Sequence, residues 1–414
     1  MWRILLADFL GELRAQRLRA LLTMGAITWG TLAVVLLLSF GEGLKRVGIL
    51  GTENAGDRMF MIWGNETAKS FQGLPKGRQI RLTEEDLELV RRSIADIDIG
   101  SPSYGRWGTK LERGEAKTTT YMEGVTPEFA ILRRMAPQPG GRFINERDVS
   151  QKRRVVFIGD SLAVRLFGRE PAVGRTVLLD GLPFTVVGVM ENKMQMGMNN
   201  GPDTERAIIP ASTFRTLYGN RYVNHLLVRP RSLAVAPAVK RQLYEVLGRR
   251  FQFDPDDERA LSFWDFVEEL RDVRRMMTGI QVFLGIVGGF TLLVAGIGVA
   301  NIMYVVAQER TREIGIKLAI GARRRHILGQ FLFESVFLSL LGGGFGLGLA
   351  ALTVALVRQV PKSNMALEFL TNPTLSWPIG LGTVGILTVI GLLAGVLPAR
   401  RSAALDPAES LRYE

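Results

Sequence analysis

The chain has no cysteine and only two histidines, His225 and His326, among its 414 residues. Without cysteine it can form no disulfide bridge, no thiolate metal site and no cysteine nucleophile. No spacing of its other polar residues indicates a Ser/Lys or a two-carboxylate catalytic site. A membrane-anchored enzyme is therefore the least favoured class of function.

A complete nucleotide-binding loop is also missing. The segment from Gly64 to Ser70 is similar to a phosphate loop, but it lacks the glycine before Lys69 that lets the backbone wrap a phosphate. We interpret this segment as a surface turn and expect no cofactor in this chain. The energy for any work that the protein does is then expected to come from elsewhere.

Charged residues are absent from four long apolar runs. Each run reaches the ~20 residues needed to cross ~30 Å of hydrocarbon. The third span is expected to begin near Ile327 and to include Glu334. A cleaved signal peptide is the alternative for the first run, but that run is too long and three more follow. The runs are residues 20–41, 276–308, 335–357 and 369–399.

Positive charge in the short connecting segments predicts the orientation. Residues 1–19 hold four Lys and Arg, residues 309–326 hold six and residues 400–414 hold three, whereas residues 358–368 hold two. Because Lys and Arg are retained in the cytosol, both termini are predicted to be cytosolic and residues 42–275 extracytoplasmic. The net charge of +12 therefore indicates membrane orientation and no nucleic-acid partner.

The long segment between the first two spans has the short mixed elements of an α/β domain. Thr83 and Asp86 predict the start of a helix, and Asp180-Gly181 predicts a tight hairpin turn. Asp160 is expected to cap a short helix that Gly168 ends. The other expected elements are strands at residues 155–158, 177–179, 184–189, 207–209 and 223–228 and helices at residues 83–94 and 237–247.

These features predict an α-helical membrane protein with four transmembrane helices plus a large mixed α/β extracytoplasmic domain inserted between the first and second spans. Residues 1–41 would form an N-terminal amphipathic helix and the first span, and residues 42–275 the extracytoplasmic domain. Residues 276–414 would hold the other three spans and a cytosolic loop. The amphipathic helix would lie either along the inner membrane surface or against the helix bundle.

Glycines four residues apart recur in the spans, a spacing that lets helices approach closely. They predict either self-association of the bundle or packing within one chain. No Asp, Lys or Arg interrupts the apolar runs, which argues against a polar substrate channel through these helices. The pairs are Gly285/Gly289, Gly342/Gly346, Gly344/Gly348 and Gly391/Gly395.

A methionine-rich segment follows residue 189 and includes Met190, Met194, Met196 and Met198. Thioethers are soft ligands for Cu(I), and flexible methionines also make adaptable contact surfaces. We expect a contact surface or an ordinary loop here, with a copper site as the less favoured alternative. No metal site is predicted elsewhere.

The segment from Glu309 to His326 reads E-R-T-R-E-I-G-I-K-L-A-I-G-A-R-R-R-H and lies between two apolar runs. With L-L-V-A-G-I-G-V-A-N-I-M before it and Q-F-L-F-E-S after it, the chain resembles the permease of MacB-type ABC transporters, within the FtsX-like permease family. The outer segment V-V-F-I-G-D-S-L-A resembles the MacB-like extracytoplasmic core domain.

The resemblance implies a multi-pass protein of the cell inner (cytoplasmic) membrane that works as a homodimer with a separate cytosolic ABC ATPase subunit. ATP, bound by that partner, would drive a motion that is transmitted to the outer domains and causes efflux or release of substrate. The segment after the second span would contact the ATPase, with plain anchoring to lipid as the other interpretation of its charges. The contact residues carried over are Glu309, Arg310, Arg312, Glu313, Ile314, Lys317, Gly321 and Ala322.

Two classes of function remain open. An efflux permease would also engage a periplasmic adaptor protein and an outer-membrane channel. The alternative is a non-transporting FtsX-type regulator of cell-wall hydrolases, and lipoprotein release is a third use of the same architecture. The long outer domain favours efflux, while macrolide, peptide, lipid and siderophore all stay open as substrates.

Overall fold

The computed structural model describes residues 17–56, 58–195, 199–309, 316, 319–320, 323–360 and 372–404. The chain divides into two compact units. The helical unit comprises Met1–Val47 and Met276–Glu414, and the sheet unit comprises Gly48–Arg275. The expected amphipathic helix at the N-terminus lies outside the described residues.

Long helices make up the helical unit. Within the described residues, three are long and apolar enough to cross a membrane, over Leu21–Ala55, Phe266–Ile302 and Arg325–Arg358. A shorter apolar stretch, Trp377–Leu393, lies in the last helix, so the fourth span stays a prediction. The helices are α2 (Arg17–Ala55), α9 (Phe266–Glu309), α11 (Arg324–Arg358) and α13 (Trp377–Ala404).

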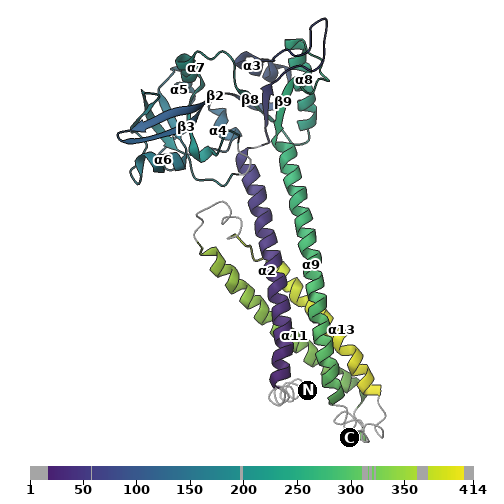
Figure 1. Ribbon diagram of the computed structural model, residues 1–414. Coiled ribbons are helices and arrows are strands. Elements are labelled where there is room, and N and C mark those ends of the chain that lie inside the picture. The colour runs from purple at the N-terminus through teal and green to yellow at the C-terminus, as the bar shows by residue number, and fades with distance from the viewer. Residues whose placement is uncertain are drawn as a thin grey trace. The chain divides into compact units, whose positions relative to one another are not determined.

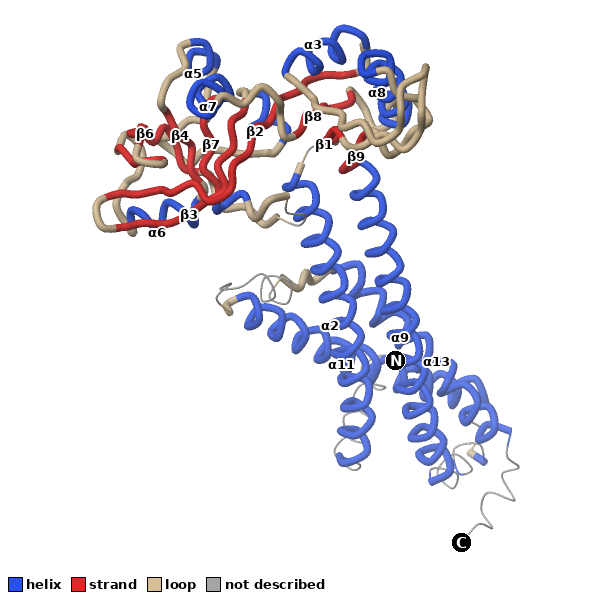
Figure 2. The backbone as a smooth tube through the Cα atoms, turned by 45° about the horizontal axis from the view of Figure 1, so that its top comes forward, coloured by secondary structure: helices blue, strands red, loops and turns tan. Residues whose placement is uncertain are grey.

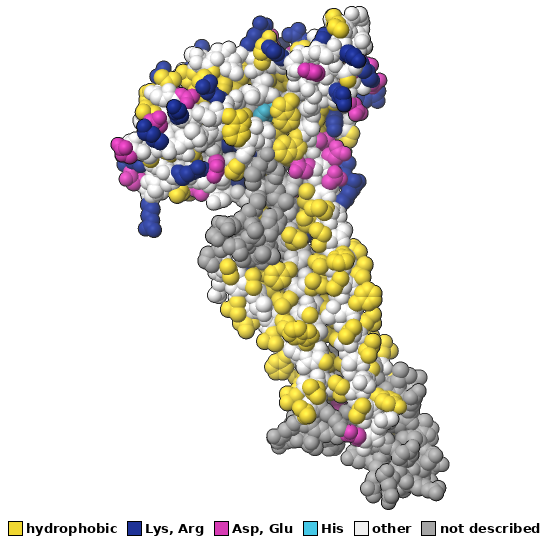
Figure 3. Space-filling view, viewed as in Figure 1, with side chains coloured by type: hydrophobic (Ala, Val, Ile, Leu, Met, Phe, Trp, Pro, Cys, Tyr) yellow, Lys and Arg dark blue, Asp and Glu magenta, His cyan; other side chains and the backbone are white. Residues whose placement is uncertain are grey.

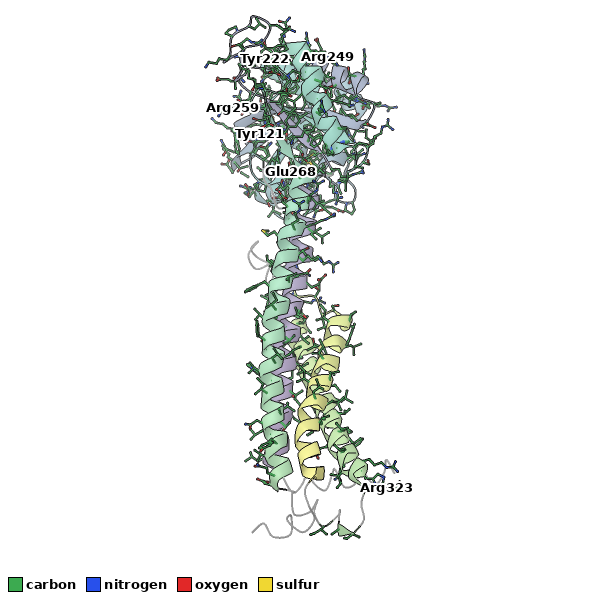
Figure 4. The ribbon with its side chains drawn as sticks, turned by 90° about the vertical axis from the view of Figure 1, so that its right-hand side faces the viewer. Tyr121, Tyr222, Arg249, Arg259, Glu268 and Arg323 are labelled. Atoms are coloured by element: carbon green, nitrogen blue, oxygen red, sulfur yellow. The ribbon has the colours of Figure 1, made fainter. Side chains whose placement is uncertain are left out.

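The chain runs back and forth through the helical unit. The start of α2, the end of α9, the start of α11 and the end of α13 gather at one end of it (Figure 1). Arg323, directly before α11, lies at this end (Figure 4). Hydrophobic side chains cover the visible face of these helices, whereas charged side chains gather over the sheet unit (Figure 3). On α9, Phe283, Val294 and Ile297 are 64–70% exposed, as expected of side chains that face lipid.

One glycine pair lies where α11 crosses α2. A Cβ atom at Gly346 would stand 2.6 Å from the carbonyl oxygen of Thr28 and from the Cβ of Thr31. The carbonyl of Gly342, one turn earlier, accepts a 3.0 Å hydrogen bond from Thr28 Oγ1. This pair therefore serves packing within one chain. A Cβ atom at Gly348, in contrast, would have no neighbour within 4 Å among the described residues.

The sheet unit is built on one nine-stranded sheet with the order β3-β7-β4-β6-β5-β2-β8-β1-β9 (Figure 2). Because β3 also pairs with β2, the strands from β3 to β2 close into a ring, and β8, β1 and β9 extend from it. The long strand β2 (Ile97–Arg113) belongs to both parts, since it pairs with β8 through residues 97–103 and with β3 through residues 103–113. The other strands are β1 (Phe60–Gly64), β3 (Ala116–Val125), β4 (Val155–Ile158), β5 (Thr176–Leu179), β6 (Leu182–Val189), β7 (Arg206–Pro210), β8 (His225–Pro230) and β9 (Leu261–Asp265).

Two apolar clusters cover the two faces of this sheet. Because side chains alternate along a strand, Phe60 and Ile62 of β1 join the larger cluster, while Met61 joins the smaller one. The smaller cluster also contains Phe266 and Ala55 and so reaches the ends of α9 and α2. The helices of the sheet unit are α3 (Glu84–Ser93), α4 (Glu128–Leu132), α5 (Glu146–Ser150), α6 (Asp160–Phe167), the 3₁₀ helix η1 (Asp203–Glu205), α7 (Ala211–Tyr218) and α8 (Ala236–Phe251).

Local sequence signals agree with most of the described elements. Thr83 and Asp86 form the expected capping box of α3, and Asp180 and Gly181 take the positive φ angles of 47° and 81° that a tight hairpin requires. The prediction for Asp160 was wrong. Gly159 is the N-cap of α6, because the Asp160 carboxylate instead accepts hydrogen bonds from the side-chain amides of Gln138 and Asn192.

Helix packing at Gly346 is testable with a matched control. Gly346→Ala should destabilise the helical unit, because the new methyl group meets the backbone of α2 and either helix must shift. Gly348→Ala, two residues further on α11, should change the melting temperature little. The measurement is thermal unfolding of both variants in the same detergent. Equal melting temperatures would contradict this contact.

Orientation is testable because the chain has no native cysteine. Ser70→Cys, at an exposed position of the sheet unit, should react with a membrane-impermeant maleimide in intact cells. Ser402→Cys, in α13, should react only after the membrane is opened, because positive charge retains that end in the cytosol. Labelling of the second variant in intact cells would overturn the predicted topology.

Candidate coupling site

Of the predicted ATPase-contact residues, only Glu309 is described. It is the last residue of α9, a helix that begins at Phe266. The others, Arg310, Arg312, Glu313, Ile314, Lys317, Gly321 and Ala322, lie outside the described residues. Their role as the contact surface therefore stays a prediction, and the described part of the site is the helix pair that leads away from it.

Polar bridges join α2 and α9 at two levels. In the helical unit, the side-chain amide of Gln281 accepts a 3.1 Å hydrogen bond from Lys45 Nζ and donates a 2.6 Å bond to Glu42 Oε2. In the sheet unit, Arg274 Nη2 of α9 lies 3.1 Å from Glu53 Oε1 of α2. Hydrogen bonds to charged groups contribute roughly 1.5–3 kcal/mol, whereas a largely exposed ion pair such as Arg274–Glu53 contributes about 0–1 kcal/mol. These bridges bind the two helices into a pair.

A buried ion network lies on the face of the sheet that carries the smaller apolar cluster. Asp203 is at its centre, with Arg133 Nη2 at 2.7 Å, Lys193 Nζ at 2.8 Å and Arg206 Nε at 3.3 Å from its carboxylate. Arg206 continues to Glu123 through a 2.7 Å contact. Arg133, Asp203, Arg206 and Glu123 are all at most 1% exposed. Removing one partner from such a network typically costs about 3–5 kcal/mol, because a charge stays buried without compensation.

Burial and neighbouring charges shift the pKa values of Asp203, Lys193 and Arg206. Burial alone would raise the pKa of Asp203, but the charges of Arg133, Lys193 and Arg206 outweigh burial and hold it far below its ordinary value. Burial lowers the pKa of Lys193 to about 8, against the attraction of Asp203. For Arg206, burial is outweighed by Asp203 and Glu123, which raise its pKa. Asp203 and Arg206 therefore stay charged in the folded protein at neutral pH.

His225 adjoins the far end of this network. Its ring is buried, with Nε2 at 3.7 Å from Glu123 Oε1 and the ring centre at 5.4 Å from that of Trp63. The same carboxylate accepts a 2.5 Å hydrogen bond from Ser103 Oγ. Burial lowers the pKa of His225 to about 4, so the imidazole is neutral at physiological pH. The described residues contain no group of three or more His, Asp or Glu that could hold a metal ion.

The segment that is similar to a phosphate loop has other bonding partners. The amides of Ala68 and Lys69 both donate to Asp257 Oδ2, at 2.7 and 3.0 Å, and Lys69 Nζ donates to the carbonyl of Asp256. A Cβ at Gly64 would stand 2.1 Å from the carbonyl oxygen of Ile80, so glycine is needed for a close approach of two backbones. The segment is held as part of the sheet unit.

The methionine-rich segment is divided between core and surface. Met190 was grouped with the loop, but it is fully buried in the smaller apolar cluster. Met194 is half-buried, and Met196 and Met198 lie outside the described residues. The expected role of the loop as a contact surface stays a prediction, but Met190 takes no part in it because its side chain fills the core.

Sequence reasoning missed the residues of the buried network. Glu123 interrupts the apolar strand pattern Y-M-E-G-V, and Arg206 begins the strand R-A-I-I-P. A charge within a buried strand must be paired, so these two positions carried a usable signal. Arg133 and Asp203 carried no such signal. Each lies at the end of a short helix, where charged residues are common.

Two regions of the chain match known protein families. Residues 20–246 match the MacB-like periplasmic core domain, and residues 285–407 match the FtsX-like permease C-terminal domain. The chain belongs to the MacB-like family of FtsX-like permeases. The resemblance found in its motifs is thereby confirmed, and the chain is a membrane permease with a large extracytoplasmic domain.

Relatives of this MacB-like permease differ in length. The macrolide export ATP-binding/permease protein MacB of Wolinella succinogenes is 31% identical over 97% of this chain, which spans 60% of that protein. The ABC transporter permease YknZ of Bacillus subtilis, named as uncharacterized, is 28% identical over 98% of both chains. The crystal structure of the periplasmic region of MacB from Actinobacillus actinomycetemcomitans is 17% identical, with a TM-score of 0.43 over 53% of this chain and 94% of that one.

Burial of His225 predicts a loss of stability in mild acid. As the pH falls below 6.5, the unfolded chain binds a proton at this residue, whereas the folded chain does so only near pH 4. The unfolded state is therefore favoured progressively within that window, by roughly 2–3 kcal/mol at its lower end. Urea unfolding of the sheet unit in the detergent-solubilised chain, followed by tryptophan fluorescence, should show part of this loss between pH 7 and pH 5.

His225→Gln is the matched control for this effect. It keeps a polar side chain beside Glu123 but has no proton to bind, so its stability should change less between pH 7 and pH 5. Carboxyl groups titrate mainly below this range and contribute equally to both proteins. The same decline in wild type and variant would show that His225 is not the cause.

Proposed function

We propose that this MacB-like permease is the membrane subunit of an ABC transporter, and that it transmits the motion of a cytosolic ATPase to its extracytoplasmic domain. The observation that carries the proposal is α9, which is one unbroken helix from Phe266 in the sheet unit to Glu309 at the charged segment. A continuous helix is stiff along its axis, so a displacement at one end reaches the other.

The bridged helix pair supports transmission of force over passage through a pore. Gln281 joins α9 to Glu42 and Lys45 of α2, so a displacement of one helix is shared by the other. The apolar runs contain no Asp, Lys or Arg to line a polar channel. Substrate would instead be moved outside the membrane by the sheet unit.

The names of the relatives favour export of a substrate as the function of this chain. The Wolinella protein is named for macrolide export, and the Bacillus relative, of about the same length as this chain, is named an ABC transporter permease. We infer that this chain serves efflux, with ATP bound by an ABC ATPase, as one of two permease copies and together with a periplasmic adaptor and an outer-membrane channel. Its four spans would lie in the inner membrane with both termini in the cytosol.

Docking of the ATPase is expected to depend on Glu309, the last residue of α9, and on Glu313 in the segment that follows it. The negative charges of Glu309 and Glu313 flank the positive charges of Arg310 and Arg312. Such a pattern can form complementary ion pairs with a partner protein. Glu309→Lys or Glu313→Lys should abolish co-purification of the ATPase and the permease-dependent change in its ATP turnover. Membrane insertion should stay normal, because added positive charge favours the same orientation.

Glu268→Lys is the matched control, because it makes the same charge reversal in the first turn of α9 (Figure 4). It should bind the ATPase as the wild type does. If both variants at the charged segment also keep wild-type binding and turnover, the segment is a lipid anchor and the proposed ATPase contact is wrong.

A further inference from the structure

The last turn of α2 is capped by a side chain from the methionine-rich segment. Carbonyl groups at a helix C-terminus lack partners within the helix and carry the negative end of its dipole. Lys193 Nζ donates a 2.9 Å hydrogen bond to the carbonyl of Asn54, one residue before α2 ends. It also donates a 2.5 Å bond to the carbonyl of Arg133, which directly follows α4. One ammonium group therefore caps two helices.

A second contact holds the same helix end. The side-chain amide of Asn54 donates a 3.0 Å hydrogen bond to the carbonyl of Met194. Asn54 is thus bound through its backbone by Lys193 and through its side chain by the next residue of the loop. We call this pair of contacts the α2 clasp.

The clasp is connected by ionic contacts to strands β7 and β3 of the sheet. Lys193 Nζ lies 2.8 Å from Asp203, and Asp203 contacts Arg206, the first residue of β7. Arg206 in turn contacts Glu123 of β3, the strand that closes the ring. A continuous set of short ionic contacts therefore runs from the end of α2 to two neighbouring strands.

The effect of Lys193 on the clasp can be tested without leaving an unbalanced charge in the buried network. Without Lys193, the cations Arg133 and Arg206 still balance the anions Asp203 and Glu123. Removing this lysine therefore leaves equal numbers of buried cations and anions, whereas removing Asp203 or Glu123 would leave an excess of buried positive charge. What its ammonium adds is the connection to Asn54 and to the end of α4.

We propose that Lys193 is the positioning residue that fastens the end of α2 to the sheet, so that a displacement of α2 reaches strands β7 and β3. This inference rests on the proposed function of the chain as a transmitter of ATPase motion. In this proposal the motion of α2 passes to the sheet unit through the side chain of Lys193. The sequence alone had suggested copper binding or partner contacts for the segment that contains this lysine.

The clasp itself is tested on the full chain without any partner. Lys193→Met keeps the length and apolar stem of the side chain and removes its three donors. Hydrogen exchange should become roughly 10- to 100-fold faster at residues 48–55 and 191–195, because a charged hydrogen bond is lost at each segment. Lys117→Met is the matched control, since Lys117 is an exposed lysine with one ion pair to Glu112. It should leave both segments unchanged.

Two further variants separate the clasp from general destabilisation. Asn54→Ala removes only the bond to Met194 and should accelerate exchange in the same two segments while the ion network stays intact. Lys193→Cys can be converted with bromoethylamine to an aminoethyl thioether, a close copy of lysine, because the chain has no other cysteine. This conversion should restore slow exchange. Uniform acceleration over the sheet unit, or no rescue, would overturn the clasp.

The role in transmission is tested on the complex with the ATPase in lipid nanodiscs. Co-purification first verifies that each variant is assembled. Wild type and Lys117→Met should show a nucleotide-dependent change in hydrogen exchange at β3 and β7, and Lys193→Met should lose it. If Lys193→Met keeps this change, the inference is wrong although the clasp exists. If wild type shows no change either, the proposed function fails, and the role of Lys193 fails with it.

Discussion

Burial of charge is the constraint on which the sheet unit depends. Asp203 is fully enclosed, and it can stay ionised there only because three cations surround it. Those cations come from the end of α4, from the methionine-rich segment and from β7, so the folded position of each element is required by the others. An ion network of this kind adds little net stability over an apolar core, but it tolerates few alternative arrangements.

The helical unit obtains its structure by other means. Its helices pack through shape, with Gly346 letting the backbone of α2 approach and with large apolar side chains turned outward. Within this unit, the side chain of Gln281 adds the polar bridges from α9 to Glu42 and Lys45 of α2. The MacB-like permease thus combines a helical unit that packs through small and apolar side chains with a sheet unit whose interior holds paired charges.

The sequence predicted best those elements whose signals lie within the element itself. A membrane span needs an apolar run, Thr83 and Asp86 cap their own helix, and Asp180-Gly181 turns its own hairpin, so these elements were all readable locally. The strands of residues 97–125 were not, although β2 and β3 pair with each other across a short turn, because β3 is buried from Thr120 to Val125 and shows no alternation of exposed and buried residues there. Lys193 was equally hidden. Two of its three acceptors are backbone carbonyls, which every residue possesses, so no side-chain pattern indicates the contact.

The pairing of β1 with β9 limits how the two helices can pull on the sheet. The strands are antiparallel, and Phe60 opposite Asp265 forms the rung nearest to both helix connections. If α2 and α9 were drawn apart, the load would fall on that rung alone, and the ladder would unzip one hydrogen bond at a time. If they move together, every rung is carried along unstrained. The β1–β9 ladder would therefore stay intact if the two helices moved together, and it would break from the Phe60–Asp265 end if they separated.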